Sequence, residues 1–211
     1  MLNSVMRKLM IITFALLSFS FMFAQTRVKE EHYLNENNQP ILLAEFQGKV
    51  SLPEKYGYTI VSETDSTLTS KIVFREQTGI LEPEEHDSVV TALQHLTGKM
   101  VTASQIIIVH YFYKEPVKTQ APCIDHYTSD KNYIKYIDRQ SGIAQFFITE
   151  NGFTYSRKSV IEDTGKIIHN LLFKDVMHCG NYIIIKPNGH YYKRVGEYRQ
   201  DDIQNKIKGD W

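Results

Sequence analysis

The sequence lacks an excess of charge of either sign, because its 24 lysines and arginines equal its 24 aspartates and glutamates. Removal of residues 1–24, which include Arg7 and Lys8 and no acidic residue, would leave a slight acidic excess. Nucleic acids and anionic membranes attract strongly basic proteins, so nothing in this balance favours either as a partner.

Short motifs of the common enzyme classes are also missing. The chain contains no glycine-rich phosphate loop, no Gly-x-Ser-x-Gly elbow and no His-Glu-x-x-His zinc motif. Each of these motifs provides the local geometry that a particular chemistry needs. Their absence means that the sequence gives no motif evidence for an ordinary hydrolase or a nucleotide-dependent enzyme. We expect no cofactor, and a protein without catalytic activity is favoured over an enzyme.

The N-terminus has the pattern of a secretory signal peptide. Arg7 and Lys8 precede an apolar run from Leu9 to Phe23, and Ala24 stands before polar sequence begins. The run is about 15 residues long, shorter than the roughly 20 that a membrane-spanning helix needs, so a cleaved signal is favoured over an uncleaved anchor. No second long apolar stretch follows. We therefore predict a soluble protein, periplasmic or extracellular, without a membrane span after cleavage.

Only two cysteines are present, Cys123 and Cys179. Both would enter an oxidising compartment, where a single pair more often forms a disulfide than remains as two thiols.

Three segments are predicted along the chain: a signal peptide over 1–24, an N-terminal extension over 25–79 and one α/β domain over 80–211. In the extension, 58–62 and 69–75 have the composition of strands joined by a hairpin connection. We expect this extension to complete or cover a sheet.

The domain begins with a helix that has Pro83 in its first turn and Gly98 at its end. A non-alternating apolar run over 105–113 predicts a strand buried on both faces. Residues 114–130, which include Cys123, are predicted to form a long loop. The elements expected after it are a short helix around 133–137, a strand over 143–149, a helix that starts at a capping box of Ser159 and Glu162, strands over 182–186 and 190–195, and a helix over 200–208.

This order of elements resembles the thioredoxin-like superfamily. The tail from Tyr182 to Glu197, with an Asn-Gly turn between two strands and Gly196 after the second, resembles the last hairpin of that fold. The resemblance covers 80–208 in element order and 181–208 in motif. It implies a three-layer α/β sandwich, a central mixed sheet with helices on both faces.

Two hallmarks of the active family members are absent. Those members carry Cys-x-x-Cys at the start of the helix after the central strand, where one thiol becomes a nucleophile. The corresponding stretch here has Cys123, followed three residues later by His126. The position of the family's cis-proline falls on Asn181. The resemblance is therefore to a divergent member.

The resemblance also implies that the loops carrying Cys123 and Cys179 are neighbours. Three hypotheses follow: a structural disulfide, a redox-active disulfide, or a metal site formed by Cys123, His126, His178 and Cys179. Adjacent His178 and Cys179 could not easily bind one tetrahedral ion.

A further candidate is the aromatic and basic stretch 191–194, which could stack on a ligand, although alternation along a hairpin strand explains it equally well. The function predicted from all of this is a non-catalytic binding or assembly module with an unknown protein partner. The alternative is a thiol-disulfide oxidoreductase or metal-handling protein that uses Cys123 and Cys179.

Overall fold

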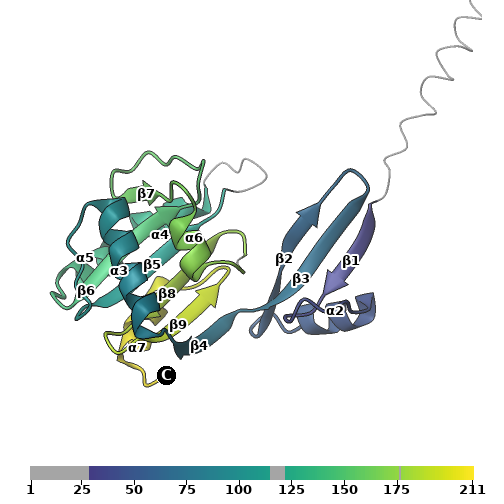
Figure 1. The fold of residues 1–211 in the computed structure, drawn as a ribbon, viewed down its shortest axis with the longest axis horizontal. Helices are drawn as coiled ribbons and strands as arrows, with labels where there is room; N and C mark the ends of the chain where they lie inside the picture. The colour runs from purple at the N-terminus through teal and green to yellow at the C-terminus, as the bar shows by residue number, and fades with distance from the viewer. Residues whose placement is uncertain (1–28, 115–121, 176) are drawn as a thin grey trace, which may run out of the picture.

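A computed structural model describes residues 29–114, 122–175 and 177–211 (Figure 1). The predicted signal peptide over 1–24 lies outside the described residues. Those residues form an α/β structure with two mixed sheets, one of three strands and one of six. Among them, no helix combines the length and the apolar character that crossing a bilayer requires.

The N-terminal unit, residues 29–74, contains the three-stranded sheet. Its elements are β1 (Glu30–Leu34), α2 (Leu43–Val50), β2 (Tyr56–Glu63) and β3 (Thr67–Phe74). The central strand β3 pairs in parallel with β1 and antiparallel with β2, which confirms the predicted hairpin. Helix α2 packs on the sheet through Phe46, whose ring lies 4.7 Å from that of Tyr33 and 5.7 Å from that of Tyr58.

The larger unit contains the six-stranded sheet in the order β4-β9-β8-β5-β6-β7. Its elements are β4 (Glu76–Ile80), α3 (Pro83–Thr97), β5 (Ile106–Phe112), α4 (Cys123–Ser129), α5 (Lys131–Asp138), β6 (Ile143–Thr149), β7 (Val160–Glu162), α6 (Ile167–Leu172), β8 (Gly180–Ile185), β9 (His190–Val195) and α7 (Gln200–Lys208). The predicted boundary at 79/80 falls inside β4, which pairs with β9 at one edge of this sheet.

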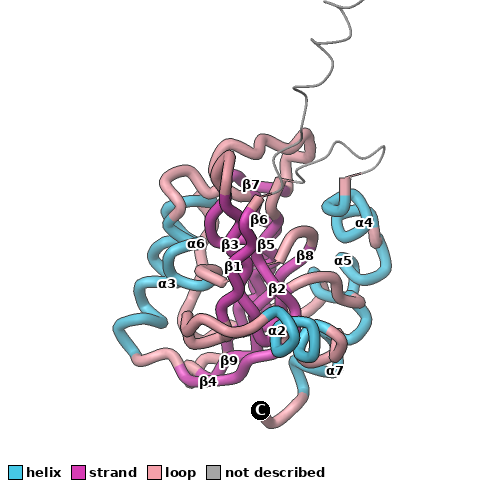
Figure 2. The backbone as a smooth tube through the Cα atoms, turned by 90° about the vertical axis from the view of Figure 1, so that its right-hand side faces the viewer, coloured by secondary structure: helices cyan, strands magenta, loops and turns pink. Residues whose placement is uncertain are grey.

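Helices cover both faces of the larger sheet. Helices α3 and α6 lie on one side of it and α4, α5 and α7 on the other (Figure 2). Two separate apolar clusters fill the two interfaces, one that includes Leu93 and Ile168 and one that includes Ile124, Ile137 and Ile203. Strand β5 lies between β6 and β8, and its predicted burial on both faces is confirmed.

Several local predictions are confirmed with their physical cause. Helix α3 has proline in its first turn, a capping box between Glu82 and Glu85, and a left-handed residue, Gly98 at φ 66°, after its last turn. The 187–189 turn joins β8 to β9, and α7 closes the chain.

Two local predictions are wrong. Cys123 does not lie in a loop but is the first residue of α4; residues 115–121 of that predicted loop lie outside the described residues. Ser159 and Glu162 do not form a capping box, because Val160–Glu162 pairs with β6 as β7. The Glu162 carboxylate instead accepts hydrogen bonds from Gly152 N (2.7 Å) and the Thr154 hydroxyl (2.8 Å).

Helix α6 therefore begins later, at Ile167, and the buried Asp163 supplies its cap. The carboxylate of Asp163 accepts hydrogen bonds from Ile168 N at 3.2 Å and His169 N at 2.9 Å. It also accepts one from the Tyr111 hydroxyl at 3.0 Å, which ties the start of α6 to the central strand.

Candidate functional site

Cys123 and Cys179 form a disulfide, as predicted. Their Cα atoms lie 5.6 Å apart although 56 positions separate them in sequence. Strand β5 ends where β8 begins, since Phe112 pairs with Gly180. The bridge therefore joins the first residue of α4 to the residue that precedes β8. Both cysteines are half-buried and pack against the apolar cluster beneath α4, α5 and α7.

Asn181 fastens the segment that carries Cys179. Its side-chain nitrogen donates hydrogen bonds to the carbonyl oxygens of Tyr111 (3.2 Å), Met177 (3.0 Å) and Cys179 (3.3 Å). Its oxygen accepts from Met177 N (3.2 Å) and Gly196 N (3.1 Å). The side chain is fully buried, so these bonds replace water as the partner of every polar group involved.

Cys179 itself adopts a left-handed backbone conformation, with φ 74°. An L-residue with a Cβ pays roughly 1 kcal/mol or more for that conformation. The Asn181 bond to the Cys179 carbonyl oxygen holds the peptide in this orientation.

Aromatic rings pack beside the bridge. Tyr127 and Tyr198 stack with ring centroids 4.4 Å apart, and the Tyr127 hydroxyl accepts a hydrogen bond from Tyr198 N at 3.2 Å. A Cβ atom on Gly180 would lie 2.6 Å from Cε1 of Tyr198 and 2.9 Å from Cζ of Tyr127. Glycine is therefore required at this position by the close approach of both rings.

The two predicted histidines do not join the cysteines in one ligand set. His126 on α4 and His178 before Cys179 are both exposed, and the His126 ring contacts Tyr127 edge-on at 5.4 Å. Across 29–114, 122–175 and 177–211, no three His, Cys, Asp or Glu side chains are grouped so that they could hold a metal ion. Metal binding and nucleophilic attack both require a thiolate, and the disulfide leaves neither sulfur in that form.

Sequence reasoning missed a polar cluster in the core, centred on His110 of β5. The ring is fully buried and stacks on Phe147 with centroids 4.5 Å apart. Its Nε2 lies 3.0 Å from Gln145 Oε1 and 3.2 Å from the Tyr133 hydroxyl, and its Nδ1 contacts the Tyr198 hydroxyl. The only sequence signal was a histidine inside an otherwise apolar run.

Burial lowers the pKa of His110 to about 4, against a smaller opposing effect of the Gln145 hydrogen bond. Burial also holds the pKa of the Tyr198 hydroxyl well above its usual range, so this group stays protonated and donates to Nδ1. The proton of the neutral imidazole then lies on Nε2, toward the Gln145 oxygen. This cluster joins β5 to β6, α5 and the segment before α7.

No protein-family model, curated protein or solved structure matches this chain. The site must therefore be interpreted from its own geometry, in which the two cysteines, the buried amide and the aromatic rings fix one end of the sheet.

Proposed function

We propose that this chain is an exported, non-catalytic binding module of thioredoxin-like fold. The fold assignment is supported by the helices on both faces of a mixed sheet and by the terminal β8, β9 and α7. Export is supported by the pattern over 1–24 and by the disulfide, which persists in oxidising compartments.

A structural role for the bridge is supported by its surroundings. At the position where the active relatives carry proline, Asn181 directs its whole hydrogen-bonding capacity to the backbone around the bridge. In the chain-entropy model, a bridge closing a loop of this length stabilises the fold by about 4 kcal/mol. Both sulfurs thus serve the stability of the larger unit.

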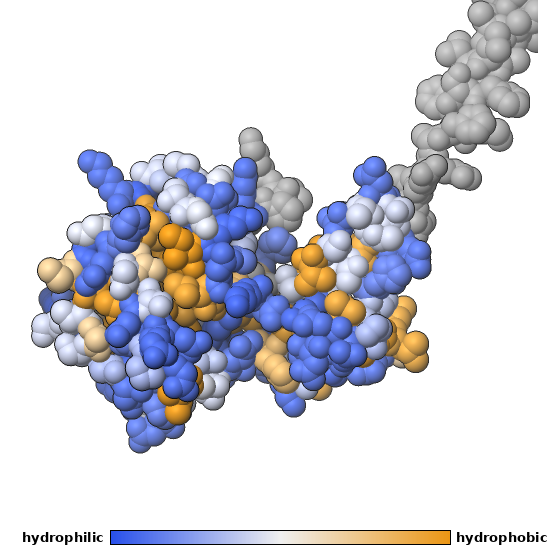
Figure 3. All heavy atoms as spheres, viewed as in Figure 1, coloured by the Kyte–Doolittle hydropathy of each residue, from blue (hydrophilic) through white to orange (hydrophobic). Residues whose placement is uncertain are grey.

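The observation that carries the binding role is the uneven distribution of exposed apolar side chains. Seven of the eleven large apolar side chains that are exposed in the described residues belong to the N-terminal unit: Leu42, Leu43, Leu52, Tyr58, Ile60, Val61 and Phe74. Hydrophobic residues are visible on the surface of this unit in Figure 3. Exposed apolar groups gathered in this way mark interaction surfaces.

Strand β2 is the best-defined part of this surface. It is an edge strand of the three-stranded sheet, so one side of its backbone has no partner strand among the residues that the structure describes. Tyr58, Ile60 and Val61 on β2 are 47%, 43% and 48% exposed. An exposed edge with apolar side chains can receive an extended segment of another protein as an additional strand. We infer that the partner binds along β2.

Site-specific photo-crosslinking tests this proposal. A photoreactive phenylalanine at position 58 in the exporting cell should give one discrete protein adduct. The same group at Lys135, exposed on α5 of the larger unit, should give none. Ile60→Asp should abolish the adduct at position 58, because a charge on the edge strand opposes strand addition. Equal adducts at both positions, or an adduct indifferent to Ile60→Asp, would contradict a partner surface on β2.

A further inference from the structure

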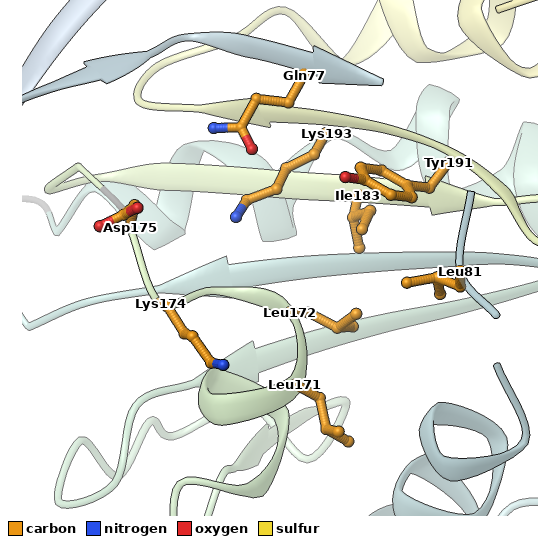
Figure 4. Close-up of a pocket in the computed structure, with 9 residues that line it drawn as sticks. All are labelled: Gln77, Leu81, Leu171, Leu172, Lys174, Asp175, Ile183, Tyr191 and Lys193. Atoms are coloured by element: carbon orange, nitrogen blue, oxygen red, sulfur yellow. The ribbon is translucent and has the colours of Figure 1, made fainter. Parts of the chain in front are cut away.

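A small pocket lies on the α3 and α6 side of the six-stranded sheet, away from the disulfide. It has a volume of about 190 Å³ and lies between β4, β8, β9 and the chain at the end of α6 (Figure 4). Leu81, Leu171, Leu172 and Ile183 supply apolar walls. Gln77 and Tyr191 add polar groups.

The side chain of Lys193 extends from β9 into this pocket (Figure 4). Lys193 is only 8% exposed. Among the residues that the structure describes, its ammonium makes no hydrogen bond and no ion pair; it faces the Phe173 ring, with 5.5 Å from Nζ to the ring centroid. A buried charge without a counter-ion is costly, so an anion in the pocket would relieve that cost.

The nearest carboxylate is already neutralised. Both oxygens of Asp175 accept hydrogen bonds from Nζ of Lys71, at 2.9 and 3.0 Å. Lys71 on β3 is itself only 5% exposed, whereas the Asp175 side chain is 42% exposed. Lys174 also lines the pocket. Lys71, Lys174 and Lys193 together outweigh Asp175, and the described surroundings of the pocket are positive.

Burial lowers the pKa of Lys193 to about 8, and Asp175 opposes this shift. At neutral pH most Lys193 side chains are therefore protonated and positively charged. Above that pKa the charge of Lys193 is lost, so any anion held by its ammonium should leave as pH rises.

We propose that this pocket binds a small aliphatic carboxylic acid, with the carboxylate on the Lys193 ammonium and the alkyl chain against Leu81, Leu171 and Leu172. A phosphate dianion would need several converging N–H donors, whereas Lys193 is the one buried ammonium of the described lining, Lys174 is exposed, and four of the nine lining side chains are aliphatic. The volume is below the roughly 300 Å³ typical of drug-sized ligand pockets, so the acid is short. This site is independent of the partner surface on β2.

Calorimetric titration of the purified protein with sodium hexanoate tests the proposal. Hexanamide and inorganic phosphate serve as probes of charge and of anion class. Hexanoate should bind saturably in the millimolar range, more tightly than either probe, and more weakly at pH 9.5 than at pH 7. Lys193→Met should weaken hexanoate at least about tenfold, while Lys135→Met, a matched change at an exposed lysine, should leave it unchanged.

Equal affinity for hexanamide, tighter binding of phosphate, or no saturation with hexanoate would overturn the proposal. If Lys193→Met does not fold, NMR of the wild-type protein labelled at the lysine side chains decides the question. The lysine resonance that titrates near pH 8 should move on addition of hexanoate at pH 7. An unmoved resonance would overturn the assignment.

Discussion

The side-chain nitrogen of Asn181 donates a hydrogen bond to the carbonyl oxygen of Tyr111 at 3.2 Å, across the β5–β8 pair. The same amide bonds the backbone of Met177, Cys179 and Gly196. One buried side chain thus connects the central strand, the disulfide segment and the residue that follows β9.

Asn181→Ala should lower the free energy of unfolding by about 3 kcal/mol, because several buried backbone groups lose their partner and water cannot replace it. Urea unfolding under oxidising conditions measures this. Asn132→Ala, at an exposed position on α5, should change stability by less than about 0.5 kcal/mol. A loss at Asn181 as small as the loss at Asn132 would show that the amide does not hold the segment.

Helix α6 has two candidate capping residues, Asp163 from the structure and Ser159 from the sequence pattern. Asp163→Ala should destabilise the fold by about 3 kcal/mol, since Ile168 N, His169 N and the Tyr111 hydroxyl would be left without their acceptor. Ser159→Ala should be nearly neutral, because Ser159 is exposed and precedes β7. Thermal unfolding of both variants gives the comparison. The reverse ranking would restore a helix that starts at Ser159.

His110 should make stability depend on pH in a defined window. Its pKa is about 4 in the folded protein and about 6.5 when unfolded, so the unfolded chain binds the proton first as pH falls. The contribution of His110 to the free energy of unfolding is therefore constant above about pH 6.5. It falls by about 3 kcal/mol between about pH 6.5 and pH 4.

Unfolding free energies of the wild type and His110→Gln, measured from pH 7 to pH 4, isolate this effect because other groups titrate equally in both. The wild type should lose about 3 kcal/mol more than the variant. His126→Gln, at an exposed histidine, should keep the wild-type slope. Parallel curves for the wild type and His110→Gln would mean that folding leaves the proton affinity of His110 unchanged, which would contradict a buried imidazole that is held neutral.

Elements could be predicted from the sequence where the residues that specify them are close together in the chain. Pro83 and Gly98 marked the two ends of helix α3, and the 187–189 turn marked the β8–β9 hairpin. The resemblance to the thioredoxin-like superfamily implied the proximity of Cys123 and Cys179, which the disulfide confirms.

Elements that depend on distant partners could not be predicted. The extended conformation of Val160–Glu162 comes from pairing with β6, which overrides the local capping pattern. Helix α4, with seven residues, is too short to show a helical period. Strand β1 lies in polar sequence, and the apolar side of the eight-residue helix α2 finds its partner only through contacts of Phe46 with Tyr33 and Tyr58.

The Lys193 pocket could not be predicted from the sequence either. Residues 191–194 suggested a ligand site by composition, but a hairpin strand explains that composition as well. The isolation of the Lys193 charge depends on the pairing of Asp175 with Lys71, which lie 104 positions apart in sequence.

The claim that the Cys123–Cys179 bridge is structural is tested most directly by a redox titration of the purified protein, followed by alkylation and intact mass. The bridge packs against the core and its segment is fastened by Asn181, so it should open only at a strongly reducing potential, below about −300 mV. The reduced protein should be less stable by about 4 kcal/mol. Opening near −200 mV without loss of stability would contradict a structural bridge and favour thiol-disulfide exchange at Cys123 and Cys179.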